Sequence, residues 1–164
     1  MARGEAAAER HRGAAAALVE AGVVTGLIAG GAMLFFLCVA SGWLGPGFLA
    51  PVKAFAGVLL RRGALGGGSG ATVLGLLVHG AVSVCIGVAF TAIAVRERTG
   101  PMASVGAGIL FAIGAWVVMT FVAARFLDPP LWELARSMPF TWFAAHLVYG
   151  MAMGWARQLR DELR

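Results

Sequence analysis

Four long runs of apolar residues, separated by short polar or proline-containing connections, account for most of the chain. The clearest is residues 71–95, which has no charged side chain and lies between a glycine-rich segment and Arg96-Glu97-Arg98. A helix rises about 1.5 Å per residue and the hydrocarbon core of a bilayer is about 30 Å thick, so roughly 20 apolar residues cross it. This run therefore predicts a membrane-spanning helix.

The other three runs predict spans at about 19–44, 101–127 and 139–157. The first ends at Gly45-Pro46-Gly47 and the third before Asp128-Pro129-Pro130, where proline and glycine stop a helix. The segment at about 51–62 is too short and too charged to cross, and it predicts an interfacial helix in the first loop. We therefore predict an all-α integral membrane bundle of four transmembrane helices, with residues 1–164 forming a single membrane domain.

Composition supports this class. Hydrophobic residues make up 60% of the chain and charged residues 13%, against roughly 45–50% and 25% in soluble domains. The net charge of +5 comes from basic residues scattered over connections and tails. Without a basic patch interleaved with aromatic residues, a nucleic-acid partner is not predicted. The predicted partner is the lipid bilayer.

The basic residues also predict an orientation. The two termini and the middle turn hold eight of them, and the other two loops hold five: Arg3, Arg10, Arg12, Arg96, Arg98, Arg157, Arg160 and Arg164, against Lys53, Arg61, Arg62, Arg125 and Arg136. Lysine and arginine favour the cytoplasmic side. The Ala-, Gly- and Arg-rich composition is typical of a GC-rich bacterial genome. We predict a bacterial inner-membrane protein with both termini in the cytoplasm.

Small residues recur at every fourth position in three of the spans, which places them on one helix face. Such faces allow close approach of helices, a main source of association in lipid. The predicted helix-packing residues are Gly22, Gly26, Gly30, Gly75, Ser83, Gly87, Gly150 and Gly154. Three such stripes exceed what one four-helix bundle needs. They predict contacts with other membrane subunits or with further copies of the chain.

The two halves of the chain resemble each other. His79 is followed eight residues later by Gly87, and His146 is followed in the same way by Gly154. This pattern favours two tandem helical hairpins of the same orientation, with chance similarity as the alternative. In such a repeat the two histidines lie at nearly the same depth. If the second and fourth spans are neighbours, the two imidazoles face each other.

Three roles are open for these histidines. The first is structural, with each ring hydrogen-bonded to a neighbouring helix. The second is ligation of a b-type haem, which needs two axial imidazoles from facing helices at one depth. His79 and His146 are the candidate ligands for this cofactor. A proton or metal role is the third. The structural role requires no cofactor, and we take it as the expected one.

The sequence does not favour an enzyme. It has no acidic pair, Ser-His-Asp set, CxxC or HExxH motif, so neither catalytic residues nor a metal site are predicted. Cys38 and Cys85 fall within apolar spans as small hydrophobic residues. Transporters usually have interrupted helices and ionisable residues near the midplane. The spans predicted here are continuous and apolar at mid-depth, although a small oligomeric transporter or channel stays open.

A family resemblance accompanies these motifs. The chain carries Gly22-xxx-Gly26, the Gly45-Pro46-Gly47 stop, His79-xxx-Ser83-xxx-Gly87 and His146-Leu147-Val148-Tyr149-Gly150. These motifs resemble those of a loose group of small four-helix bacterial inner-membrane proteins, and the resemblance implies neither an activity nor a residue role. The function predicted from sequence is a non-catalytic accessory subunit of a larger membrane complex. A haem-b electron-transfer subunit is the alternative.

Overall fold

The computed structural model describes residues 2–94 and 100–162, which form helices joined by short turns, without strands. This confirms the predicted all-α class. The helices are α1 (Ala2–Leu44), α2 (Ala50–Phe55), α3 (Gly57–Leu60), α4 (Gly63–Gly66), α5 (Ser69–Ala94), α6 (Pro101–Val118), the π-helix η1 (Met119–Ala124), α7 (Arg125–Leu127), α8 (Pro129–Ser137) and α9 (Pro139–Glu162).

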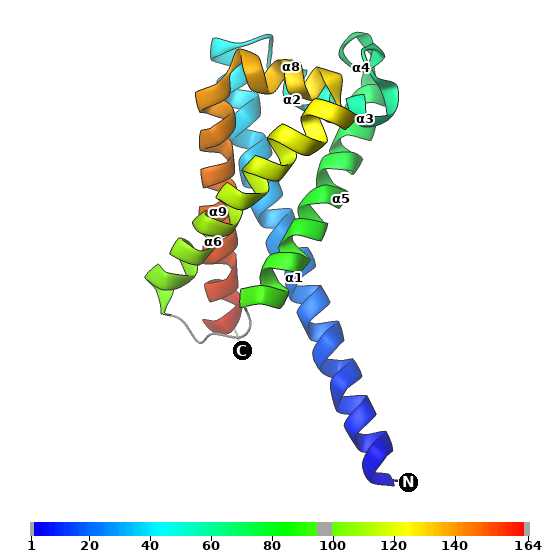
Figure 1. Cartoon of the computed structure of the whole chain (residues 1–164), viewed down its shortest axis with the longest axis vertical. Coiled ribbons are helices and arrows are strands. Elements are labelled where there is room, and N and C mark those ends of the chain that lie inside the picture. Colours follow the sequence, from blue (N-terminus) through cyan, green and yellow to red (C-terminus); the bar gives the residue numbers. More distant parts are fainter. Residues whose placement is uncertain (1, 95–99, 163–164) are drawn as a thin grey trace.

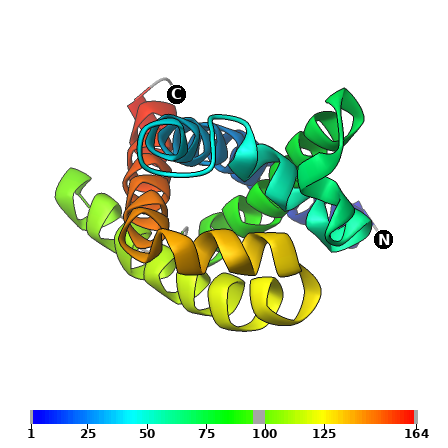
Figure 2. The same cartoon turned by 90° about the horizontal axis from the view of Figure 1, so that it is seen from above.

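Four long helical rods form the body of the molecule: α1, α5, α6 with its continuation through η1 and α7, and α9. Figure 1 shows α1 and α6 running in one direction and α5 and α9 running in the other. α1 packs against both α5 and α9, and α6 packs against α9, whereas α5 and α6 touch each other only slightly. The rods therefore follow the order α5–α1–α9–α6, with a weakly closed seam between the first and the last (Figure 2).

Three of the described helices are long and apolar enough to cross a membrane: His11–Leu44, Ser69–Ile93 and Met102–Leu127. The fourth predicted span, 139–157, is helical within α9 but does not meet the same criterion. α9 packs between α1 and α6, and it buries Trp142, His146 and Tyr149. A helix shielded in this way needs less apolar surface than one that faces lipid.

Short helices close the end of the bundle opposite the N-terminus of α1. Figure 1 shows α2, α3, α4 and α8 gathered there. The predicted interfacial segment 51–62 is helical, but it is broken at Arg61, whose φ is 52°. Its apolar residues divide between two surroundings, since Val52 and Phe55 are buried against the bundle and Leu59 and Leu60 are exposed. The Arg61 guanidinium donates a hydrogen bond to the Leu127 carbonyl at 3.0 Å, which ties this segment to α7.

The end of α1 follows the proline–glycine stop. The Ser41 carbonyl accepts hydrogen bonds from the backbone N–H groups of Gly45 and Gly47, both at 3.1 Å. The Ser41 hydroxyl donates to the Gly47 carbonyl at 2.9 Å. Gly47 has a φ of 125°, which is accessible essentially to glycine alone. The chain thereby reverses and enters α2 across the top of the bundle.

Candidate functional site

A cavity of about 170 Å³ lies inside the bundle, beneath the short helices. Its walls come from α5, α9 and the α6–η1 rod, with α2, α3 and α8 closing it. Most lining side chains are apolar, among them Met33, Val82 and Met119. Six lining residues carry polar groups: His79, Ser83, Asp128, Trp142, His146 and Tyr149. The cavity therefore has a mostly apolar lining with a small set of hydrogen-bonding atoms.

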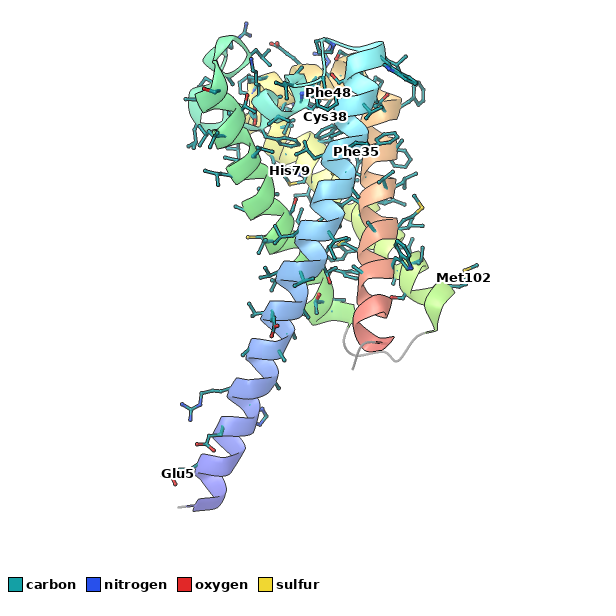
Figure 3. The ribbon with its side chains drawn as sticks, turned by 180° about the vertical axis from the view of Figure 1, so that it is seen from behind. Glu5, Phe35, Cys38, Phe48, His79 and Met102 are labelled. Atoms are coloured by element: carbon teal, nitrogen blue, oxygen red, sulfur yellow. The ribbon has the colours of Figure 1, made fainter. Side chains whose placement is uncertain are left out.

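His79 lies on α5 with 7% of its surface exposed. Its Nε2 is 3.0 Å from the carbonyl oxygen of Gly30 on α1. A carbonyl only accepts, so Nε2 carries the hydrogen and donates it. A Cβ at Gly30 would meet the Ser83 side chain, so its absence lets α5 lie this close to α1. Figure 3 shows His79 lying toward α1. The ring nitrogen left over is Nδ1.

His146 is held in the complementary way. Its Nδ1 is 2.9 Å from the carbonyl oxygen of Trp142, one turn earlier in α9, and must donate to it. The ring nitrogen left over is Nε2. Neither Nδ1 of His79 nor Nε2 of His146 makes a hydrogen bond to another residue in the part of the chain that the structure describes. Both histidines thus reach the cavity with one ring nitrogen unused.

A row of aromatic rings connects the two histidines. Phe55, from α2, lies 4.4 Å from the His79 ring and 6.4 Å from the Trp142 ring between centroids. The Trp142 and His146 rings follow at 5.0 Å. Phe55 and Trp142 therefore link the two imidazoles through a chain of ring contacts. Sequence reading missed this role of Phe55 because the loop was expected to face the membrane.

Two side-chain hydrogen bonds join α9 to the other helices that line the cavity. The Tyr149 hydroxyl donates to the backbone carbonyl of Ser83 at 3.0 Å, which joins α9 to α5. The Trp142 indole N–H donates to the Thr120 hydroxyl at 2.8 Å, which joins α9 to η1. Both bonds use up the proton of the donor side chain. The side chains are thereby fixed in place before any ligand enters.

The wall formed by η1 belongs to the third predicted span, which is helical without interruption from Met102 to Leu127. Residues 119–124 form one π-helical turn, in which backbone hydrogen bonds skip one residue more than in an α-helix. Such turns are frequent at functional sites. Met119 and Ala123 from this turn line the cavity. The π turn thus changes the hydrogen-bond pattern of this span where it borders the cavity, without breaking the helix.

The predicted helix-packing residues all lie against helices of the same chain. At the α1–α5 contact, a Cβ added to Gly22, Gly26, Gly30 or Gly87 would meet atoms of the opposite helix. Gly150 and Gly154 lie in the same way against α6, and Gly75 lies against α2. Ser83 contributes its carbonyl to Tyr149 and lies opposite Gly26 and Gly30. The surplus of small-residue surface that predicted external partners is thus taken up internally.

Asp128 was predicted only to end a helix, but it is also part of the cavity wall. It precedes α8, and its Oδ1 accepts a hydrogen bond from the Leu131 N–H at 3.0 Å. Burial raises the pKa of this carboxyl to about 6, partly offset by backbone hydrogen bonds from Leu131 and Val58 and by the Arg61 charge, which lower it. The sequence signal was present, since an aspartate before two prolines is a typical helix N-cap.

The cavity does not fit a bis-histidine haem. An engineered apolar cavity of roughly 150 Å³ holds one benzene molecule, so the 170 Å³ found here is small for a macrocycle of four pyrrole rings. Nε2 of His79 is engaged by Gly30, and Phe55 occupies the space beside the ring. Among the described residues, no group of three or more His, Cys, Asp or Glu is placed to hold a metal ion.

Together these features define an all-helical membrane-embedded protein with three helices able to cross a bilayer and a small internal cavity that presents two histidines. Comparison of the chain with protein-family models, with curated proteins and with solved structures finds no match.

Proposed function

We propose that this protein binds a small apolar or amphiphilic molecule taken from the surrounding membrane, in the cavity between His79 and His146. The observation that carries the proposal is a benzene-sized cavity, apolar on most of its wall, with one unused nitrogen on each of two buried histidines. A molecule with one polar end and an otherwise apolar body is complementary to that wall.

Packing alone is a weaker explanation of the same site. Protein interiors are close-packed and hold few voids larger than a water molecule. Most buried polar atoms in them have hydrogen-bond partners. A site used only to fasten helices would be expected to close over Phe55 and Trp142, instead of leaving a space lined by both histidines. The preformed cavity therefore favours binding.

Benzene, added to the purified protein in mild detergent, tests whether the cavity binds. Because a ligand of the folded state raises its stability, we expect the melting temperature to rise with benzene concentration. Ala115→Phe, at the cavity wall, should abolish the rise. Ala103→Phe is the matched control, because Ala103 is exposed on the same helix. Equal shifts in all three proteins would mean that benzene acts on the micelle and would contradict the proposal.

The accessory-subunit function stays a prediction of the sequence, and so does the oligomeric-transporter alternative. The haem-b alternative stays a prediction too, but the size of the cavity counts against it. The glycine stripes no longer support an accessory role, because their contacts are internal. Purification of the protein in mild detergent distinguishes the accessory-subunit function from the ligand-binding function. A stoichiometric membrane partner would support the accessory function, and a stable monomer without a partner would count against it.

A further inference from the structure

The cavity has a neighbour on the outside of the bundle. A groove of about 530 Å³ runs between α5 and α6, and it shares three lining residues with the cavity: Ile86, Ala115 and Met119. Cys85 and Leu110 line its outer part and are exposed. Both helices are long and apolar enough to cross a membrane. The cavity therefore adjoins a groove that faces the hydrocarbon of the bilayer.

The positions of the glycines explain why α5 and α6 are only weakly packed against each other. Between α1 and α5, and between α6 and α9, glycines face the opposite backbone and bring the helices together. Between α5 and α6 there is no comparable approach among the described residues, and Gly114 in the groove faces open space. The two hairpins close tightly within themselves and meet loosely along this line. The groove is the result.

The hydrogen bonds around the cavity decide which polar group fits it. Nδ1 of His79 and Nε2 of His146 carry no hydrogen in the neutral rings, so both are acceptors. The Tyr149 hydroxyl already donates its hydrogen bond to the Ser83 carbonyl, so its oxygen can only accept a further one. The indole N–H of Trp142 is also used. The free ring nitrogens of His79 and His146 and the Tyr149 oxygen can therefore only accept, and the ionised Asp128 carboxylate accepts as well. Trp142 offers no acceptor, and the Ser83 hydroxyl can still donate.

We propose that the ligand carries a hydroxyl donor at one end and an apolar tail, as in an alkylphenol or a related alcohol. This inference rests on the proposed function and names its ligand class. The head enters the cavity from the bilayer through the α5–α6 groove and donates its hydrogen bond to a histidine nitrogen. The tail stays in the groove against Ile86, Ala89 and Val118.

An ether or hydrocarbon of the same shape fits less well. When such a ligand fills the cavity, the unprotonated histidine nitrogen is shielded from water and receives no hydrogen bond from the ligand, at a cost of about 1–3 kcal/mol. A hydroxyl donor restores the missing bond. Since 1.4 kcal/mol corresponds to a factor of ten in affinity, the donor is worth about tenfold or more.

The test compares 4-hexylphenol with 4-hexylanisole, its methyl ether, which lacks the donor. Binding to the full-length protein in mild detergent is followed by ¹⁵N NMR of histidine-labelled protein, with partition into micelles measured separately for each probe. We expect the phenol to bind about tenfold more tightly. It should also shift the resonance of an unprotonated nitrogen of His79 or His146, and the ether should not.

The two proposals fail differently. If both probes bind equally well and displace benzene, the cavity binds ligands but the donor preference is overturned. If neither probe binds and benzene does not bind either, both proposals are overturned. His146→Phe should reduce the preference for the phenol, measured within this variant as the ratio of the affinities for the phenol and the ether. A preference that persists in this variant and in His79→Phe would contradict the assignment of the histidines as acceptors.

The route through the groove has its own variant pair. Gly114 lines the groove and not the cavity, so Gly114→Trp should fill the groove, and Gly106→Trp is the control, since both glycines lie on α6 and face open space. We expect Gly114→Trp to bind 4-hexylphenol about tenfold more weakly than Gly106→Trp does, because the tail loses its apolar contact area. Equal affinities of 4-hexylphenol for the two variants would overturn the groove as the site of the tail.

Discussion

Asp128 joins two parts of the molecule at the scale of a single residue. Its carboxylate caps α8 and also closes one end of the cavity, where it is buried. The hydrogen bond from the Leu131 N–H favours the charged Asp128 carboxylate, whereas burial favours the neutral carboxyl group. Burial is the larger effect, and it raises the pKa to about 6 from an ordinary value of 3.8. The stability of the fold should therefore depend on pH through this group.

We expect the melting temperature to fall as the pH rises from about 4 to about 6 and to level off above that range. The sign follows from the raised pKa, because in this window the folded state binds the proton more readily than the unfolded state does. Asp128→Asn keeps the capping oxygen but does not titrate, so its melting temperature should be flat over the same window.

Differential scanning fluorimetry in detergent across this pH range checks the expectation. Glu133→Gln is the control, because that carboxylate lies on the surface with 57% of its side chain exposed. It should keep the pH dependence of the native protein. A pH profile that Asp128→Asn leaves unchanged would show that another group controls the stability.

At the scale of elements, the contact between α1 and α5 depends on a few glycines. Gly87 lies against Gly22 and Gly26, so an added Cβ would meet backbone atoms that cannot turn aside. We expect Gly87→Ala to destabilise the protein by about 2 kcal/mol, as overpacking does elsewhere. Gly80→Ala on the same helix faces open space, and it should change stability by about 1 kcal/mol at most.

Unfolding by SDS titration of the two variants beside the native protein measures this difference. Equal stability of Gly87→Ala and Gly80→Ala would mean that the two helices are held apart more widely than the structure has them. The comparison also separates tight packing from the general cost of glycine in a helix, since both substitutions make the same chemical change.

The apolar periodicity of the sequence predicted the elements well and their details poorly. The run 71–95 became α5, and the stop at Gly45-Pro46-Gly47 ends α1 where expected. The π turn in the third rod was not predicted from the sequence, and neither was the hydrogen bond that its Thr120 accepts from Trp142 across the bundle. The inward packing of Phe55 also depends on a ring contact with His79 that sequence spacing does not reveal.

The candidate site was predictable only in part. Spacing predicted that His79 and His146 belong to equivalent positions of the two hairpins, and both line one cavity. Their tautomers follow from the carbonyls of Gly30 and Trp142, which only the folded backbone supplies. The cavity itself is a property of four packed rods.

At the scale of the whole molecule, the position of α9 leads to a prediction about the termini. α9 ends at the same end of the bundle at which α1 begins (Figure 1). If α9 crosses the membrane with its neighbours, the number of spans is even and both termini lie on one side. The positive-inside rule predicts the cytoplasmic side, although of the eight arginines counted for it all but Arg12 have side chains outside the described residues.

Reporter fusions check this arrangement. Alkaline phosphatase is active only outside the cytoplasm. Green fluorescent protein fluoresces in the cytoplasm, but it does not fluoresce when it is exported in an unfolded form. We expect fusions to either terminus to give fluorescence and no phosphatase activity. Phosphatase activity at one terminus alone would mean that α9 does not cross and that the protein has three spans.

The length of α1 has a mechanical consequence. Its first half extends beyond the rest of the bundle (Figure 1), and the stretch from Glu5 to Gly30 is roughly 40 Å at the helical rise of about 1.5 Å per residue. The same unbroken helix supplies the carbonyl that holds His79. The projecting arm is in this sense a lever whose fulcrum is the close contact at Gly22 and Gly26. If α1 turned as a rigid rod about that contact, a sideways push at its outer end would move the Gly30 carbonyl, which orients the His79 imidazole, by a smaller amount in the opposite direction.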